Sequence, residues 1–206
     1  MAVKTFAVTP GFGVGGTIFK PEQLAALGTI IGEDAKVELT TFKQLYVKMN
    51  EDLEIEVRQK LMEVGLEVHP AGFVSKSLIT CNFCRGADEA GLDVAKVLDA
   101  AIAGHEVPSP LKIGYAGCAL GTSEPLLKDI AVVKMRDSYD IYVGGDAKGL
   151  KATFAQLLMS NLQKDQLVPI VSKLIELFQL QGKKKEKFTR FIERITIAEL
   201  REYVVK

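Results

Sequence analysis

Short apolar runs separate the polar stretches of this chain, and their order predicts most of its secondary structure. Runs rich in Val, Ile, Leu, Thr and Tyr are typical of strands. The predicted strands cover residues 5–8, 37–41, 44–48, 73–80, 111–115, 130–133 and 139–143.

Apolar residues at helical spacing predict the helices. Pro21 suits the first turn of one helix, and Asn50 suits the N-cap of a second, which Gly65 ends. Residues 87–103 predict a third helix, and the chain is predicted to be helical from Leu150 onward.

The C-terminal part carries two further local signals. Thr196 and Glu199 have the spacing of a capping box for the last helix. The charged run 183–187 predicts a solvated connection between helices. Because strands and helices do not alternate regularly along the chain, the pattern favours an α+β fold over a doubly wound sheet.

Composition narrows the classes of function. The chain has 206 residues, of which 48% are hydrophobic and 25% charged, enough for one sizeable core or two small subdomains that share one. Its 26 basic and 26 acidic side chains give zero net charge, which argues against a nucleic-acid partner. No apolar run approaches the roughly 20 residues of a membrane span. The first residues lack a signal peptide's apolar stretch, so we expect a cytoplasmic protein without a membrane partner.

Three cysteines supply the candidate chemistry. Cys81 and Cys84 form a Cys-x-x-Cys pair, and Cys118 lies just after the predicted strand 111–115. An odd number of cysteines in a chain expected to be cytoplasmic argues against a disulfide scaffold and favours metal or redox use. We therefore predict that the loops 81–86 and 117–124 form one functional site.

A glycine-rich stretch, residues 11–16, fits the dinucleotide-binding pattern G-x-G-x-x-G, and Glu38 lies near the place of an acidic ribose partner. In such a site the last glycines open a helix, whereas residues 17–19 are Thr-Ile-Phe. The stretch therefore indicates either a turn that needs positive φ or exposed amides, such as those around Gly13 and Gly15, that approach another anionic cofactor.

The loop around Cys118 resembles a known family. Residues 112–130 read KIGYAGCALGTSEPLLKDI, and residues 139–145 read YDIYVGG. They are similar to the siroheme-dependent nitrite and sulfite reductases, in which Cys-x3-Cys precedes Glu-Pro and a later strand ends in Gly-Gly. Other segments that match in the family's order are residues 20–24, 37–41, 63–66 and 187–194.

This resemblance implies an oxidoreductase with siroheme beside a [4Fe–4S] cluster. Four cysteines, arranged as Cys-x5-Cys and Cys-x3-Cys, hold the cluster in that family, and the last one bridges to the siroheme iron. It also implies three parts: a ferredoxin-like half-domain at 1–75, a siroheme/4Fe–4S-type α+β domain at 76–148, and a C-terminal helical segment at 149–206 on the same core.

The chain departs from the family pattern at the ligand positions. Thr122 stands where the bridging cysteine is expected. If Cys84 is the first cysteine of Cys-x5-Cys, Ala90 replaces the second; if Cys81 is, Ala87 does. A family arginine near residues 40–41 is also missing, and Lys43 is the nearest cation.

Three cofactor arrangements remain open. The three cysteines can hold a cluster with a fourth ligand from elsewhere, siroheme can bind without a cluster, or both cofactors can be absent; zinc with His105 as fourth ligand is a further alternative. The resemblance implies that Lys43, Arg85 and Lys128 meet the substrate. Glu124 is expected to cap the segment that follows it. The predicted cofactor-binding residues are Gly13, Gly15, Lys43, Arg85, Gly117, Thr122, Glu124, Lys128, Gly144, Gly145 and Lys148.

Three functions follow from these arrangements: a small reductase of sulfite or nitrite, a tetrapyrrole-binding or electron-transfer accessory, and a cofactor-free relative that acts through protein partners. The first implies a small anion and an electron-donor protein as partners. Because the larger family members contain two related halves and this chain holds one copy, we also expect a homodimer.

Overall fold

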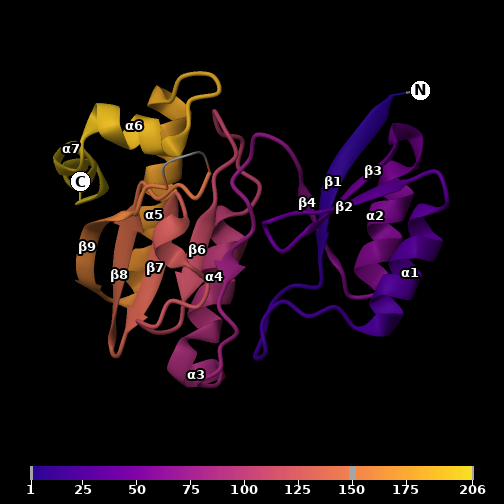
Figure 1. Ribbon diagram of the computed structural model, residues 1–206, viewed down its shortest axis with the longest axis horizontal. Coiled ribbons are helices and arrows are strands. Elements are labelled where there is room, and N and C mark those ends of the chain that lie inside the picture. The colour runs from indigo at the N-terminus through magenta and orange to yellow at the C-terminus, as the bar shows by residue number, and fades with distance from the viewer. Residues whose placement is uncertain (1, 149–151, 206) are drawn as a thin grey trace. The chain divides into compact units, whose positions relative to one another are not determined.

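The computed structural model describes residues 2–148 and 152–205, which fold into two compact units, Met1–Gly72 and Phe73–Lys206 (Figure 1). Each unit contains one sheet and its own helices, so the predicted α+β class is confirmed. No helix within the described residues is both long and apolar enough to cross a membrane.

The N-terminal unit is a four-stranded sheet in the order β2-β3-β1-β4 with two helices. Every neighbouring pair is antiparallel. Its elements are β1 (Val3–Thr9), α1 (Pro21–Ile31), β2 (Lys36–Leu39), β3 (Leu45–Asn50), the 3₁₀ turn η1 (Glu51–Leu53), α2 (Glu54–Glu63) and β4 (Glu67–Pro70).

Apolar residues at alternate strand positions and at helical spacing build the core of this unit. Strand residues Phe6 and Val47 pack with Leu27 of α1 and Leu61 of α2, and all four are buried. Asn50 caps the start of η1, since its side chain accepts the Asp52 N–H at 3.3 Å.

The C-terminal unit is a five-stranded sheet in the order β5-β6-β7-β8-β9. Strands β5, β6 and β7 are parallel, and β8 and β9 are added antiparallel. Its elements are β5 (Ile79–Thr80), α3 (Ala87–Ala90), α4 (Leu92–Ile102), β6 (Ile113–Ala116), the 3₁₀ turn η2 (Pro125–Leu127), β7 (Ile130–Met135), β8 (Ser138–Val143), β9 (Gln156–Leu162), α5 (Lys164–Gln181), α6 (Phe188–Ile195) and α7 (Ile197–Val205).

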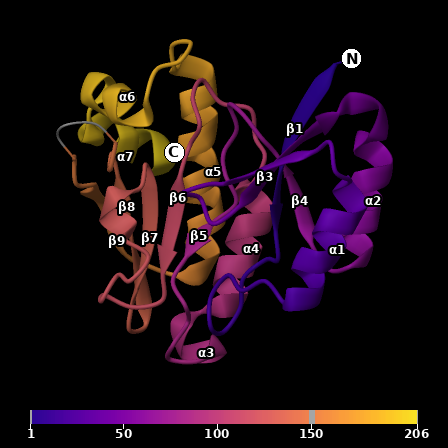
Figure 2. The ribbon, with the colours of Figure 1, turned by 45° about the vertical axis from the view of Figure 1, so that its right-hand side comes forward.

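Helices α4 and α5 pack against each other and run alongside this sheet (Figure 2). Phe178 of α5 meets Phe188 and Phe191 of α6 with ring centroids 5.1 Å apart in both pairs. This aromatic cluster attaches α6 to α5. Half of the predicted capping box of the last helix is present: the Glu199 N–H donates to Thr196 Oγ1 at 3.4 Å. The Glu199 carboxylate accepts from the Thr196 hydroxyl at 3.0 Å, while the Thr196 N–H donates to Ile192 O.

The structure corrects three predictions of secondary structure and adds one strand that was not predicted. Only Ile79–Thr80 of the predicted strand 73–80 pairs as a strand within the sheet. Gly91, at φ 69°, divides the predicted helix 87–103 into α3 and α4. Strand β4 was not predicted. The prediction that residues 150 onward are helical is wrong for Gln156–Leu162, which pairs with β8; Leu150 itself lies outside the described residues.

The division into units falls at residues 72 and 73. The three-part division at 1–75, 76–148 and 149–206 stays a prediction. Within the C-terminal unit, β9 comes from the last of these parts and joins the sheet of the middle one.

Candidate functional site

The loops that carry Cys81 and Cys118 lie at the same edge of the C-terminal sheet. Strands β5 and β6 are parallel neighbours, with Thr80 opposite Tyr115, so the residues that follow them meet at one end. The Gly117 N–H donates to Cys81 Sγ at 3.2 Å, and both groups are buried. The two predicted loops are therefore in direct contact.

The three cysteine side chains differ in environment. Cys81 is buried and accepts the Gly117 hydrogen bond, Cys84 is exposed, and Cys118 is half-buried. Among the described residues, no three His, Cys, Asp or Glu side chains gather in a metal-binding arrangement. A [4Fe–4S] cluster needs a closed set of thiolates, so the cysteines of this chain do not fit that cluster.

Ala90 fills the space beside the Cys118 loop. It is 2% exposed, and a Cβ atom added at Gly117 would lie 2.6 Å from Ala90 Cβ. The Tyr115 hydroxyl donates to the carbonyl oxygens of Ala90 at 2.9 Å and Gly91 at 3.1 Å. Burial raises the pKa of Tyr115, so its hydroxyl stays protonated and serves as a donor to the α3–α4 junction.

The loop after Cys118 is held by backbone hydrogen bonds. The Gly121 N–H donates to Cys118 O at 3.2 Å, and the Glu124 N–H donates to Gly121 O at 2.8 Å. Thr122 lies between them and is exposed. The hydroxyl of Ser123, which is buried, donates to Tyr115 O at 2.9 Å. This loop is thus folded by its own chain, with Thr122 at its surface.

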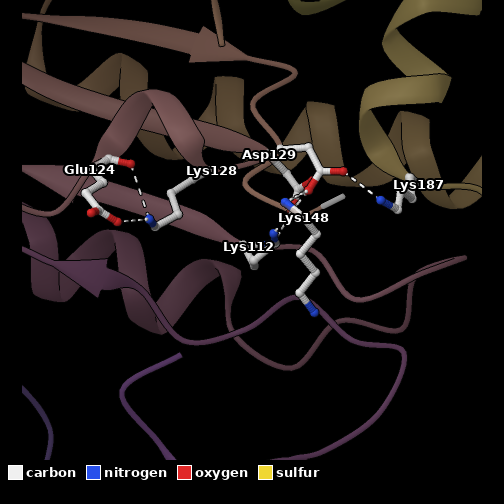
Figure 3. Close-up of polar contacts among 7 residues, drawn as sticks. Lys112, Glu124, Lys128, Asp129, Lys148 and Lys187 are labelled. Atoms are coloured by element: carbon white, nitrogen blue, oxygen red, sulfur yellow. Dashed lines mark hydrogen bonds and ion pairs between the residues drawn. The ribbon is translucent and has the colours of Figure 1, made fainter. Parts of the chain in front are cut away.

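Glu124 and Lys128 neutralise each other. Lys128 Nζ donates to Glu124 O at 3.2 Å and lies 3.7 Å from the Glu124 carboxylate (Figure 3). The Glu124 side chain makes no cap hydrogen bond to η2, so the expectation that this side chain caps the following segment is wrong. Glu124 does occupy the N-cap position, at φ 53°.

A cavity of about 930 Å³ opens beside Cys118. Three cations, Arg85, Lys134 and Arg136, line it together with two acids, and Arg85 pairs with one of those acids, Glu89, at 2.9 Å. The lining residues are Arg85, Glu89, Gly117, Cys118, Ala119, Leu120, Lys134, Met135, Arg136, Asp137, Ser138 and Asn161. The cavity therefore joins one partly accessible thiol to a slightly cationic wall.

Lys134 and Arg136 belong to the β7–β8 hairpin, and the sequence did not single them out. The hairpin turns tightly, with Met135 opposite Ser138 and Arg136 at φ 52°. The two basic residues lie between the predicted strands 130–133 and 139–143, and this position could have marked them as candidates. Its proximity to Cys118 depends on β7 pairing with β6, which the sequence pattern does not show.

An apolar cavity of about 350 Å³ adjoins the cationic one and shares Ala119, Leu120 and Met135 with it. Its other walls are mainly apolar side chains from η2, the β7–β8 hairpin and the segment before β9, namely Leu126, Val133, Tyr142 and Phe154. The two cavities together offer an apolar surface bordered by cations.

Gly144 and Gly145 follow β8 and attach its end to the segment before β7. The Gly145 N–H donates to Lys128 O at 3.1 Å, and a Cβ atom added there would collide with the carbonyl oxygens of Leu126 and Lys128. Gly145 therefore has a packing role. Lys148 contributes its backbone N–H to Asp146 Oδ1 at 2.9 Å.

A polar cluster lies next to these glycines, with Asp129 buried, Lys112 and Asp146 half-buried and Lys187 exposed. Asp129 Oδ2 accepts the Lys112 N–H at 2.7 Å, and Lys187 Nζ lies 2.7 Å from Asp146 Oδ2 (Figure 3). Burial raises the pKa of Asp129 to about 6, although the charge of Lys112 opposes the change. Burial is the largest influence on Asp146 and opposes its ionisation, but the hydrogen bonds from Lys187 and the Lys148 N–H and the charges of Lys187 and Lys112 together outweigh it and lower the pKa of Asp146.

The remaining predicted residues belong to other segments of the chain. Gly13, Gly15 and Lys43 belong to the N-terminal unit, where Gly13 and Gly16 exchange backbone hydrogen bonds of 3.1 and 2.9 Å and Lys43 has φ 58°. The stretch 11–16 is a turn, and helix α1 begins only at Pro21, as predicted. His105 is exposed, and its Nε2 lies 2.9 Å from Ala101 O. The roles predicted for these residues stay predictions.

Comparison with known proteins identifies the class. Residues 75–206 match the family model described as the nitrite and sulphite reductase 4Fe-4S domain. This match covers more than half of the chain, and the chain belongs to the nitrite and sulphite reductase family. The resemblance inferred from the sequence is confirmed.

Individual relatives are distant. The chain is 25% identical over 189 residues to cobalt-factor III methyltransferase of Priestia megaterium, a match over 92% of this chain and 34% of that protein. It is 24% identical over 122 residues to the assimilatory-type sulfite reductase of Nitratidesulfovibrio vulgaris, over 59% of this chain and 56% of that one. The chain thus spans between a third and just over half of these relatives.

A solved structure shows the same fold over nearly the whole chain. The crystal structure of dissimilatory sulfite reductase I matches 99% of this chain and 69% of its own, with a TM-score of 0.75 at 11% identity. The family's members point to siroheme and [4Fe–4S] cofactors. The family fold is therefore present here together with a cysteine set that departs from it.

Proposed function

We propose that this chain binds a siroheme-like tetrapyrrole without a [4Fe–4S] cluster, as an accessory protein that does not itself reduce sulfite or nitrite at a cluster-coupled iron. The observation that carries the proposal is the state of the cysteines: Cys81 is buried as a hydrogen-bond acceptor, and Cys84 is exposed. Ala90 and Thr122 supply a methyl and a hydroxyl where the family has thiolates.

The paired cavities support a tetrapyrrole as the ligand. Such a molecule has an apolar ring and a carboxylate-bearing rim, and the cavities offer an apolar wall beside three cations. A volume of about 930 Å³ falls in the range of cofactor pockets, about 300–1,000 Å³. Lys134 and Arg136 would pair with the carboxylates, Arg85 would do so only by leaving Glu89, and Leu120 and Met135 would contact the ring.

When bound, siroheme supplies an iron that accepts electrons and coordinates small anions. The residues of this chain would orient the ring and neutralise its carboxylates. The relatives do not share one named reaction, since one is named as a methyltransferase and another as a sulfite reductase. The fold alone therefore does not determine the reaction. This proposal also includes four further points: sulfite or nitrite as the bound anion, an electron-donor protein as partner, a homodimer, and a cytoplasmic location.

One set of measurements tests the proposal. The purified chain is titrated anaerobically with siroheme, and its absorption spectrum, iron and labile sulfide are measured. We expect a Soret band that saturates at one siroheme per chain, no labile sulfide, and no viologen-driven reduction of sulfite or nitrite. Failure to bind siroheme, stoichiometric labile sulfide, or turnover would each contradict the proposal.

Charge variants of the β7–β8 hairpin provide the matched comparison. Lys134→Ala combined with Arg136→Ala should weaken siroheme binding at least about tenfold, because each removes a charge-assisted contact. Lys184→Ala, in the exposed run between α5 and α6, is the control and should leave binding unchanged. Equal affinity in both variants would exclude this cavity as the binding place.

A further inference from the structure

Strand β2 forms an open edge of the N-terminal sheet. The strand order is β2-β3-β1-β4, and within the described residues no strand pairs with the outer side of β2 (Figure 1). All four of its residues are exposed, among them Val37 at 47% and Leu39 at 81%. An exposed edge with large apolar side chains is a template for pairing with another strand.

The β2–β3 hairpin determines which backbone groups point outward. The Thr40 N–H donates to Gln44 O at 3.1 Å, so Thr40 and Gln44 form a hydrogen-bonded pair. Such pairs alternate along an antiparallel ladder. The backbone groups of Glu38 and Lys36 therefore point to β3, and those of Val37 and Leu39 point outward.

The side chains of β2 divide between the two faces of the sheet. Val37 lies opposite Val47 and Leu39 opposite Leu45, and both β3 residues belong to the apolar core or pack against it. Val37 and Leu39 therefore extend the core face to the open edge. Lys36 and Glu38 alternate with them and lie on the other face.

We infer that β2 pairs antiparallel with β2 of a second copy of this chain, about a twofold axis through Val37. Val37 then faces the partner's Val37 as a hydrogen-bonded pair, which uses the outward backbone groups of both strands. Lys36 faces the partner's Glu38, and Glu38 faces the partner's Lys36. These are non-hydrogen-bonded pairs, in which side chains approach most closely, so two ion pairs form across the axis.

Charge selects this register over the alternatives. A twofold axis through Lys36 places two lysines opposite each other, and one through Glu38 places two glutamates opposite each other. Like charges directly opposite across strands are destabilising. An axis through Leu39 leaves Glu38 opposite the partner's Thr40 with no ion pair.

The other edge of the sheet is less suited to pairing. Strand β4 ends in Pro70, which has no N–H to donate. The pairing at β2 makes one eight-stranded sheet from two four-stranded ones and covers Val37 and Leu39. Because β2 has only four residues, the interface is small and the dimer should be weak and reversible. This inference rests on the homodimer named in the proposed function and gives its interface, and it is separable from the cofactor part of that proposal because none of the predicted cofactor-binding residues lies on β2.

Charge reversal tests the pairing and its register together. Sedimentation velocity across a dilution series should show a dimer of the wild-type chain that dissociates on dilution. Lys36→Glu alone or Glu38→Lys alone places like charges opposite each other twice, so each should weaken dimerisation at least about tenfold. The double variant Lys36→Glu with Glu38→Lys restores both ion pairs and should return the dissociation constant to within about threefold of wild type.

Two controls keep the test decisive. Lys96→Glu reverses an exposed charge on α4 and should leave dimerisation unchanged. Circular dichroism melting at a concentration where all samples are monomeric should give unchanged midpoints for both single variants, because Lys36 and Glu38 are exposed. A wild-type chain that stays monomeric at every concentration, single variants that dimerise like wild type, or a double variant that stays monomeric would each overturn the pairing.

Discussion

Gly117 packs directly on Ala90, because a Cβ atom at residue 117 would lie 2.6 Å from Ala90 Cβ and 2.7 Å from Ala90 O. Both residues are buried. The contact joins the end of α3 to the loop that carries Cys118, and it brings together the two segments in which the family places its cluster ligands. If Cys84 is the first cysteine of the family's Cys-x5-Cys, residue 90 is the second ligand position and carries alanine there, which stays a prediction.

Gly117→Ala should destabilise the chain by about 1–3 kcal/mol, because overpacking a filled site forces backbone or side-chain shifts. Urea unfolding followed by circular dichroism measures the change. Gly28→Ala is the matched control, since a Cβ atom there meets nothing within 4 Å and alanine is favoured within a helix. An unchanged unfolding midpoint for Gly117→Ala would contradict the close contact.

Restoring the family's thiolates should restore a cluster. The double variant Ala90→Cys with Thr122→Cys gives cysteines at residues 84, 90, 118 and 122, the Cys-x5-Cys and Cys-x3-Cys spacing. Anaerobic reconstitution should yield iron and labile sulfide in equal amounts, whereas the wild-type chain should yield neither. Ala87→Cys with Thr122→Cys tests the other register, with Cys81 as the first cysteine. This variant should not assemble a cluster, because Ala87 is exposed and lies three residues before Ala90, which contacts Gly117.

The sequence was sufficient to predict that the loops of Cys81 and Cys118 lie together, because the relevant signals are local. Cys81 and Cys118 follow predicted strands, and parallel strands bring their carboxyl ends together. Ala90 and Thr122 were singled out by the resemblance to the family's cysteine pattern, which left Ala87 as the alternative to Ala90. The sequence did not show that Cys81 is buried as a hydrogen-bond acceptor. This depends on the hydrogen bond from the Gly117 N–H to Cys81 Sγ, which joins residues 36 positions apart.

The sequence failed where tertiary pairing overrides local preference. Strand β9 reads Gln-Leu-Leu-Met-Ser-Asn-Leu, and most of these residues favour helices in isolation. Pairing with β8 makes them a strand. Lys134 and Arg136 were missed for a related reason, since their place beside Cys118 follows from the order of β6, β7 and β8.

The three thiols should react in the order of their exposure. N-ethylmaleimide should modify Cys84 first and Cys118 more slowly, while Cys81, at 7% exposure, should react only when the chain unfolds. Peptide mass spectrometry over time measures the three rates. Cys84→Ser should remove the fast phase and leave the slow one. Rapid modification of Cys81 in the folded chain would contradict its burial beneath Gly117.

Asp129 should make stability depend on pH in the direction opposite to most carboxylates. Burial raises the pKa of Asp129 from 3.8 to about 6, so between these values the folded state binds more protons than the unfolded state. Its contribution is therefore fully present below about pH 4 and is lost as pH rises through about 6, a change on the order of 3 kcal/mol.

Asp129→Asn isolates this contribution from those of the other acids. The amide oxygen can still accept the Lys112 N–H, which now bonds to Asp129 Oδ2 at 2.7 Å, and the variant has no proton to lose. Urea unfolding from pH 4 to pH 7 should show the wild-type chain losing stability relative to the variant as pH rises. A constant difference between the two would mean that Asp129 titrates at its ordinary pKa, with the charges of Lys112 and Lys187 fully offsetting its burial.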